Sequence, residues 1–263
     1  MQERHIDRKM YFDEQGRTTQ KHVIPYIAQF CAITPETRIL EIGCGEGGNI
    51  TPFLDMGCTV CGIDLNAQQI ENAKTYFADH PNKDKLTLVA QDIYLIPEAN
   101  IEAFDIIIMR DVIEHIHNQD KFMGFVKRFM TDKGLLFIGF PPWQMPFGGH
   151  QQICHNRRLA KLPWFHLLPV SMYRAVLRAG GENENTIETL LEVKQTGISI
   201  ERLRRIAAQQ KWDILDETLY LINPNYEVKF GLKTKKQYRL IAALPWLRNF
   251  VTTCGYYIFR VNK

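Results

Sequence analysis

The chain has 263 residues, of which 45% are hydrophobic and 23% are charged, as in an ordinary folded globular protein. Its formal net charge of +3 is too small to indicate a nucleic-acid partner, and no segment reaches the roughly 18 apolar residues that a membrane span requires. The length allows one large α/β domain with an insertion, or two small domains.

The six cysteines are scattered without the spacing of a disulfide framework. Cys58 and Cys61 form a C-x-x-C pair, but they lie across an expected buried strand, so we interpret them as core residues. Residues 1–13 are charged and lack the apolar core of a signal peptide. We therefore expect a cytoplasmic protein with reduced thiols.

Residues 1–20 are mostly polar. Thr18 or Thr19 is expected to cap a helix that carries Val23 and Ile27 on one face. From the residues alone, this part of the chain is a solvated leader followed by a packing helix.

The stretch 38–49 predicts a strand, a glycine turn and a helix in immediate succession. The apolar run at 39–42 is typical of a strand that is buried on both faces. Four glycines follow it, namely Gly43, Gly45, Gly47 and Gly48. Glycine lets the backbone bend sharply beside a ligand, and the helix N-terminus that follows offers free N–H groups. We expect a nucleotide-type cofactor loop, and G-x-G-x-x-G at 43–48 also fits the dinucleotide fingerprint.

The next two predicted strands both end in an acid. Residues 59–66 form the second strand, and Asp64 lies about 20 residues past the glycines, where a carboxylate accepts hydrogen bonds from both ribose hydroxyls. The alternative is that Asp64 is the N-cap of a helix over residues 67–78. Residues 86–92 form the third strand, which ends in Asp92.

Residues 104–109 predict a fourth buried strand, which runs into the segment 110–115. An amphipathic helix is expected over 122–129. The residues 132–134 (Asp-Lys-Gly) are expected to turn the chain into a fifth strand at 135–140.

Over residues 35–142, these motifs resemble those of the class I S-adenosylmethionine-dependent methyltransferases. The loop reads E-x-G-x-G-x-G from Glu41, and the segment from Phe104 to His115 is similar to the matching region of the ubiquinone-pathway O-methyltransferases. The resemblance implies an α/β fold, a doubly wound, seven-stranded, mostly parallel Rossmann-like sheet whose seventh strand is antiparallel and lies at one edge.

The resemblance also implies the cofactor S-adenosyl-L-methionine (SAM), with S-adenosyl-L-homocysteine as its product. The carboxylates at 41, 64 and 92 are expected to converge on the adenosine. Residues 1–34 are expected to fold over the cofactor, and Arg110 stands where an apolar residue is more usual. The implied cofactor-binding residues are Tyr11, Arg17, Glu41, Gly43, Cys44, Gly45, Gly47, Asp64, Leu65, Asp92, Ile93, Arg110, Asp111 and Val112.

The match thins past Pro142. Residues 143–150 are rich in aromatic residues, Pro and Gly, which predicts an ordered loop over the carboxyl ends of the strands. Two helices are expected near 172–177 and 187–193. We interpret 143–195 as a helical and loop cap over the substrate, inserted after strand five of a single domain. Packing against neighbouring helices or a dimer partner is the alternative.

The last quarter of the chain predicts two more strands, at 212–222 and 255–261. A helix is expected to begin at Ser199, and another is expected near 238–247. A basic run precedes the second helix and consists of Lys229, Lys233, Lys235 and Lys236. We interpret this run as a solvated face, with an anionic substrate or a membrane surface as the alternative contact.

Three histidines are expected near the reacting atoms, namely His115 after strand four, and His150 and His155 after strand five. An oxygen nucleophile must lose its proton, and histidine suits that task near neutral pH. Either acid of the segment 110–115 is a candidate for orienting the base. Cys154 with the last two histidines lacks a complete ligand set, so we expect no metal site.

Together these features predict SAM-dependent methyl transfer to a small-molecule or glycan-like acceptor, with a hydroxyl favoured over nitrogen or carbon. The mild charge and the lack of a basic module with interleaved aromatic residues argue against nucleic acid as a partner. One alternative is an NAD(P)-dependent Rossmann oxidoreductase, against which Glu41 and Asp92 argue. The other is a non-catalytic SAM-binding protein. We expect a monomer or a homodimer without an integral membrane span.

Overall fold

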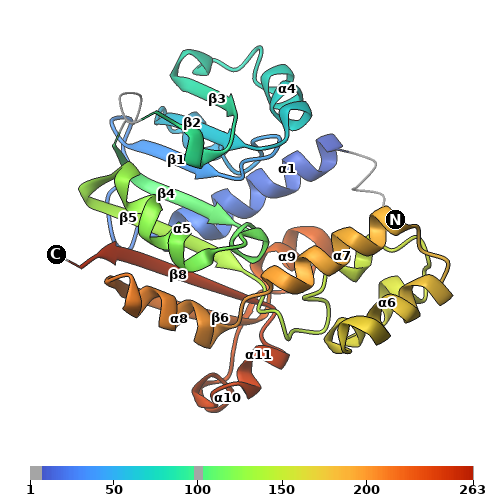
Figure 1. Cartoon of the computed structure of the whole chain (residues 1–263). Helices are drawn as coiled ribbons and strands as arrows, with labels where there is room; N and C mark the ends of the chain where they lie inside the picture. Colours follow the sequence, from blue (N-terminus) through green and yellow to red (C-terminus); the bar gives the residue numbers. More distant parts are fainter. Residues whose placement is uncertain (1–7, 98–102, 263) are drawn as a thin grey trace.

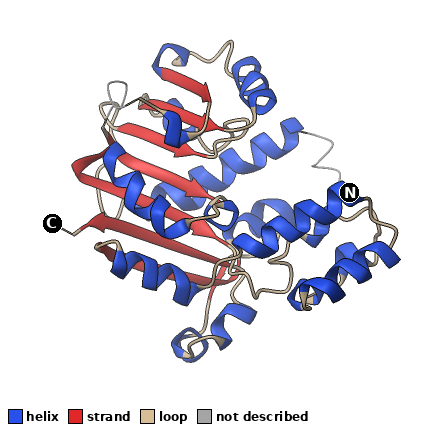
Figure 2. Ribbon diagram, in the orientation of Figure 1, coloured by secondary structure: helices blue, strands red, loops and turns tan. Residues whose placement is uncertain are grey.

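The computed structural model describes residues 8–97 and 103–262, which form one mixed sheet with helices on both faces (Figures 1 and 2). The sheet has eight strands in the order β3-β2-β1-β4-β5-β8-β6-β7. Strands β1 to β5 pair in parallel, and β8 lies antiparallel between β5 and β6. The strands are β1 Arg38–Ile42, β2 Thr59–Asp64, β3 Leu86–Ala90, β4 Phe104–Arg110, β5 Met130–Phe140, β6 Trp212–Ile222, β7 Lys235–Lys236 and β8 Cys254–Val261.

The predicted fold class is confirmed, but the strand count differs by one. Seven strands match the predicted ones, and the eighth is β7, a two-residue strand that pairs antiparallel with the outer edge of β6. Both residues of β7 are exposed lysines, so no alternation of apolar and polar residues marked it in the sequence. The antiparallel β8 lies inside the sheet, because β6 and β7 continue beyond it.

The helices cover both faces of the sheet (Figure 2). They are α1 Arg8–Thr18, α2 Ile24–Ile27, α3 Thr51–Asp55, α4 Ala67–Tyr76, α5 Gln119–Phe125, α6 Val170–Ala179, α7 Glu184–Thr196, α8 Ile200–Gln209, α9 Pro224–Phe230, α10 Arg239–Ala243 and α11 Leu247–Val251. A π-helical turn, Thr19–Val23, joins α1 to α2. In the part of the chain that the structure describes, no helix is both long and apolar enough to cross a bilayer.

Two hydrophobic cores explain the unbroken apolar runs of the central strands. Successive side chains of a strand point to opposite faces. Leu40 of β1 therefore joins the core under α5 and α8, whereas its neighbour Ile39 joins the core under α2, α3 and α4. Strand β4 divides in the same way, since Ile107 packs in the first core and Ile106 in the second. Both faces of β1 and β4 are buried, as the sequence predicted, whereas β3 at the edge of the sheet has no buried residue.

The N-terminal helix begins earlier than predicted. Thr18 is not an N-cap, because α1 already starts at Arg8 and Thr18 has helical backbone angles. Its hydroxyl donates to the carbonyl of Glu14 at 2.9 Å, the bond that a threonine makes back to the preceding turn. Leader and packing helix are thus nearly continuous in the described residues.

The predicted turn at 132–134 is wrong, because β5 runs without a break from Met130 to Phe140. The pairing of β4 with β5 shifts register between Phe104 and Ile106, and this irregularity takes up the extra residues. A Cβ at Gly134 would lie 3.1 Å from the carbonyl oxygen of Phe104, so glycine here permits close approach of two strands rather than a turn. The helix predicted near 238–247 is also interrupted, at residues 244–246 between α10 and α11.

Candidate active site

Two adjoining cavities open at the carboxyl ends of β1, β2 and β4, where a doubly wound sheet binds its ligands. The larger has a volume of about 560 Å³ and the smaller about 390 Å³. Gly43 and Asp64 line both of them. We call the larger the apolar cavity, since its walls include Ile42, Ile63, Leu65, Ile93, Val112, Ile116 and Phe122. We call the smaller the polar cavity, since its walls include Arg8, Glu46, Gln69, Arg110, Asp111, Glu114, His150, Asn223, Asn225 and Lys229.

Asp64 lies at the end of β2 and connects that strand to the glycine loop. Its carboxylate accepts hydrogen bonds from the backbone N–H of Gly45 and of Asn66, both at 2.8 Å. The N-cap of α4 is Asn66, whose side chain accepts from the N–H groups of Gln68 and Gln69. The alternative interpretation of Asp64 as a helix cap is therefore wrong. Its carboxylate faces both cavities instead.

Gly43 marks the boundary between the two cavities, and its position requires glycine. Its φ is +71°, and a Cβ would lie 2.5 Å from Cγ2 of Val112, which follows β4. A side chain at residue 43 would therefore collide with the end of β4 and strain its own backbone. Of the other predicted loop residues, Cys44 and Gly45 line the polar cavity.

Asp92 and Ile93 follow β3 on the far wall of the apolar cavity. The Asp92 carboxylate accepts from the N–H of Tyr94 at 2.9 Å, and this bond caps a short 3₁₀ turn, Ile93–Leu95. Leu65 lies on the rim and is 76% exposed. An exposed leucine beside an acid gives a ligand in this cavity both an apolar and a polar contact.

Glu41 is buried in β1 instead, and the described residues that line the two cavities do not include it. Asn49 donates to its Oε1 at 2.7 Å, whereas its Oε2 is buried without a partner among the described residues. Burial raises the pKa of Glu41 to about 8, against a lowering by the Asn49 bond and the Arg110 charge. A contact between Glu41 and a cofactor stays a prediction.

The residues after β4 divide between the cavities. Val112 lines the apolar cavity, whereas Arg110 and Asp111 line the polar one. Arg110 is nearly fully buried and donates to the hydroxyl of Thr19 at 3.2 Å. A buried cation thus stands at the position where the sequence comparison predicted an apolar residue to be more usual. Asp111 has a φ of +56°, a strained angle for a residue other than glycine, and its side chain is 41% exposed.

The N-terminal helix reaches the site through one of the two residues predicted to cover the cofactor. Tyr11 lines the polar cavity together with Arg8, which is anchored by an ion pair with Glu46 at 2.8 Å. Arg17 lies instead in a separate surface hollow between α1 and α9. Tyr11 is therefore placed where it can contact a ligand, and Arg17 is not brought to either cavity.

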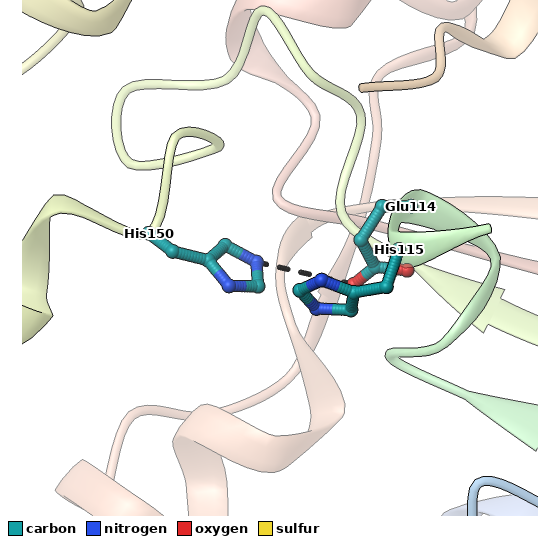
Figure 3. A group of neighbouring side chains, drawn as sticks. All are labelled: Glu114, His115 and His150. Atoms are coloured by element: carbon teal, nitrogen blue, oxygen red, sulfur yellow. Dashed lines mark ion pairs between the residues drawn. The ribbon is translucent and has the colours of Figure 1, made fainter. Parts of the chain in front are cut away.

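A cluster of Glu114, His115 and His150 lies where the loop after β5 crosses the end of β4 (Figure 3). The closest atoms of His150 and Glu114 are 4.0 Å apart, and the two imidazole centroids are 4.9 Å apart. Both carboxylate oxygens of Glu114 are buried with no hydrogen-bond partner among the described residues. The His150 side chain is 22% exposed, so it can reach a ligand in the polar cavity.

Burial favours the neutral form of Glu114 and of His150, whereas His115 is exposed. It lowers the pKa of His150 to about 3, helped by the neighbouring His115 and His166. It raises the pKa of Glu114, which Asp111 raises further. Unprotonated imidazoles can accept a proton, and together with one carboxylate they also offer three ligand atoms within 4.8 Å of one another to a divalent cation.

His155 does not join this cluster. Its imidazole is 53% exposed and pairs with Glu182 at 3.1 Å. The Glu182 carboxylate also accepts from the backbone N–H groups of His155 and Asn156, so the pair fixes the loop to the turn between α6 and α7. Of the three predicted catalytic histidines, the structure brings together His115 and His150 and places His155 outside both cavities.

The segment 143–195 contributes to the polar cavity through its first residues. Met145, Phe147 and His150 line that cavity, whereas α6 and α7 pack on a small core of their own around Tyr173 and Leu190. Trp143 is fixed through its carbonyl, which is 2.9 Å from Nε2 of the buried His166. The loop thus has an internal support that is independent of the cavity.

The sequence did not identify the walls that come from the C-terminal third. Five residues of the connection between β6 and β8 line the polar cavity, namely Asn223, Asn225, Tyr226, Lys229 and Thr253. The available signal was Asn223 followed by Pro224, since Asn caps α9 and proline is the first helical residue directly after a strand. In the apolar cavity, Gln91, Tyr94, His117, Asn118 and Lys121 were also missed.

Comparison with known proteins gives consistent matches. A model of the methyltransferase domain family matches residues 12–167. A ubiquinone biosynthesis O-methyltransferase of Brucella ovis is 33% identical over 101 residues, which are 38% of this chain and 40% of that protein. The chain thus spans about 40% of the length of the curated relatives it matches.

Two solved structures share the fold at low sequence identity. A putative sarcosine dimethylglycine methyltransferase from Galdieria sulphuraria superposes with a TM-score of 0.59 at 14% identity, covering 93% of this chain and 85% of that one. A geranyl diphosphate C-methyltransferase from Streptomyces coelicolor, in complex with Mg²⁺, geranyl diphosphate and S-adenosyl-L-homocysteine, gives 0.55 at 11% identity, covering 89% and 77%.

Proposed function

This chain belongs to the class I SAM-dependent methyltransferase family, and we propose that it transfers the methyl group of SAM to a hydroxyl of a small-molecule or glycan-like acceptor. One observation carries the proposal. The apolar cavity meets the polar cavity at Gly43 and Asp64, and the wall of the polar cavity places His150 beside the buried carboxyl group of Glu114.

The apolar cavity suits the adenosine of SAM. Asp64, which closes the glycine loop, would accept from the ribose hydroxyls, and Asp92 would accept from the adenine amine. Leu65, Ile93 and Val112 would contact the flat base. The complex of the Streptomyces coelicolor enzyme with S-adenosyl-L-homocysteine supports this assignment by similarity of fold.

The polar cavity suits the methionine end of SAM and the acceptor. Arg110 and Tyr11 offer donors for a carboxylate, and Asn223, Asn225 and Lys229 offer polar contacts for hydroxyl-rich acceptors. We include in the proposal that the N-terminal segment 1–34 covers the cofactor and that the segment 143–195 caps the acceptor. Tyr11 and the loop around Phe147, both in the wall of the polar cavity, support these two roles.

When bound, SAM supplies a methyl group on a sulfonium, which a nucleophile displaces in line. The residues of this chain would hold the acceptor oxygen near that carbon and keep water away. His150 would take the hydroxyl proton as the C–O bond forms, since it lies in the wall of the polar cavity and its side chain is 22% exposed. Glu114, whose carboxyl is 4.0 Å from the ring, is the acid that we propose orients this base.

His115 would support the base, because its ring packs edge-on against that of His150. A divalent cation held by Glu114, His115 and His150 is the competing use of the same cluster, because their donor atoms lie within 4.8 Å of one another. The two uses differ in a simple way. A base needs no added metal, whereas a metal site loses activity with a chelator and regains it with a divalent cation.

The test is methyl transfer from radiolabelled SAM to panels of phenols, saccharides and amines, with and without a chelator. We expect label in a hydroxyl-bearing acceptor and release of S-adenosyl-L-homocysteine. Transfer to amines alone would contradict the hydroxyl assignment.

Thermal shifts with SAM, S-adenosylhomocysteine, NAD and NADP test the cofactor. Stabilisation by NAD alone would favour an oxidoreductase. Binding of SAM without release of S-adenosylhomocysteine in the presence of any metabolite extract would favour a non-catalytic SAM-binding protein.

A further inference from the structure

The connection between β6 and β8 carries two short helices, α10 and α11, that project from the end of the sheet (Figure 1). The polarity of this helix pair is inverted. In α11 the buried residues are Arg248 and Asn249, whereas Leu247, Phe250 and Val251 are exposed. A surface helix normally turns its apolar stripe toward the core and its charged residues toward solvent.

Helix α10 also exposes apolar residues, although its Ala242 packs against the core. All five of its residues are at least partly exposed, and Leu240 is 82% exposed. Leu244, which follows the helix, is exposed as well. These apolar side chains lie on one continuous segment, so they form a shared surface rather than isolated exposed residues.

The inversion is fixed by specific polar contacts. Glu201 of α8 accepts hydrogen bonds from Nε of Arg248 and from the backbone N–H of Trp246, both at 2.9 Å. Asn249 donates to the other oxygen of the same carboxylate and accepts from the N–H of Ile200. The polar side chains thus hold the helix pair on α8, and its apolar residues are left pointing outward.

Trp246 stands at the tip in a strained backbone conformation. Its φ is +64° and its ψ is −50°, and the N–H of Leu247 donates to the carbonyl of Pro245 at 2.7 Å, which closes a γ-turn. Such angles persist where the surrounding contacts enforce them and where function uses them. Here the turn holds an indole that is 57% exposed at the end of the apolar surface.

The exposed charges of the chain segment that carries this surface have one sign. Residues 228–263 contain eight Lys or Arg and no Asp or Glu. Lys233, Lys235, Lys236 and Arg239 are exposed directly before and within α10. Leucine, phenylalanine and tryptophan surrounded by lysine and arginine are the composition of a surface that lies in the interface of an anionic membrane.

We propose that α10 and α11 dock this protein on an anionic phospholipid bilayer. Leu240, Trp246 and Leu247 enter the region between headgroups and acyl chains, and the lysines before α10 contact the phosphates. A protein partner of matching chemistry would need an acidic apolar surface, whereas a bilayer supplies both properties over any area. The same connection also provides Asn225, Tyr226 and Thr253 to the polar cavity.

The test is cosedimentation of the full chain with vesicles of phosphatidylcholine, with and without one third phosphatidylglycerol. We expect binding to the anionic vesicles that weakens about tenfold in high salt and in neutral vesicles. The variant L240S/W246S/L247S should lose binding about tenfold or more, and K233Q/K236Q should lose binding to anionic vesicles. Melting temperatures close to that of the wild type exclude unfolding as the reason.

The matched control is V170S/M172S on α6, which removes two side chains of equal exposure, 53% each, from another surface. It should bind vesicles like the wild type. Equal binding to neutral and anionic vesicles, retained binding in L240S/W246S/L247S, or loss in the control would each overturn the proposal. A concentration-dependent dimer without lipid that L240S/W246S/L247S abolishes would assign the surface to a second copy instead.

Discussion

The two cavities that meet at Gly43 are built in opposite ways. All residues that line the apolar cavity lie between Ile42 and Phe122, at the ends of adjacent parallel strands. The polar cavity takes residues from α1, the glycine loop, the end of β4, the loop after β5 and the connection between β6 and β8. One wall thus arises from a local chain pattern, and the other arises only when distant segments meet.

The proposed function assigns the adenosine of SAM to the apolar cavity, and it assigns the methionine end of SAM and the acceptor to the polar cavity. Of the predicted motif residues, Gly43, Asp64, Leu65, Asp92, Ile93 and Val112 line the apolar cavity, whereas Cys44, Gly45, Arg110 and Asp111 line the polar one. The segments that complete the polar cavity, such as 141–153 and 223–229, lie largely beyond the motifs. Variants in the two cavities should therefore fail in different ways. Two predictions test this and two concern residues outside both cavities, in order from the largest expected effect to the smallest.

The variant His150→Gln should lower kcat by about 10²- to 10⁴-fold, the range for removal of a general base. Its affinity for SAM should stay within about twofold of the wild type, because the proposed adenosine contacts lie in the other cavity. Steady-state kinetics with titration calorimetry would measure both. A rate within threefold of the wild type would remove His150 as the base.

The variant Asp64→Ala should weaken SAM binding by about 100-fold, because it removes charged hydrogen bonds to the ribose and frees the loop at Gly45. A matched control is Asp55→Ala, since Asp55 is exposed, pairs with His80 and lies outside both cavities. Calorimetric titration gives both affinities. Equal affinity for SAM in the two variants would show that Asp64 does not contribute to cofactor binding.

The variant Glu41→Gln tests an acid that lines neither cavity among the described residues. The pKa of Glu41 in the folded protein is raised to about 8, above its ordinary value of 4.5, so the folded protein binds the proton more tightly than the unfolded protein. Its contribution to stability is full below about pH 4.5 and is lost as the pH rises toward 8.

Wild type should therefore lose about 2 kcal/mol of unfolding free energy between pH 5.5 and pH 7 that Glu41→Gln does not lose. Urea unfolding at several pH values measures the difference, and glutamine keeps the acceptor for Asn49. Parallel pH profiles of the two proteins would show that Glu41 is ionised in the fold.

The smallest effect is expected for His155→Gln, which serves as a control for His150→Gln because both histidines follow β5. The imidazole of His155 is exposed and pairs with Glu182, away from both cavities, so we expect kcat within about twofold of the wild type. A loss of kcat comparable to that of His150→Gln would indicate that His155 also takes part in catalysis.

The sequence by itself determined the sheet and one cavity wall. Parallel strands that are buried on both faces leave unbroken apolar runs, and the glycines and acids that follow them mark the ligand edge. For this reason Gly43, Asp64 and Asp92 were found without coordinates. Each of these signals lies within a few residues of the strand end that it marks.

Only the tertiary structure decided the rest, because periodicity reports burial and not which distant segments meet. Glu41 shares the motif with Gly43, but its position inside β1 turns its side chain into the core. His150 and His155 belong to the same predicted loop, yet one meets Glu114 and the other meets Glu182. The apolar surface of α10 and α11 also became visible only when the contacts of Glu201 showed which side faces outward.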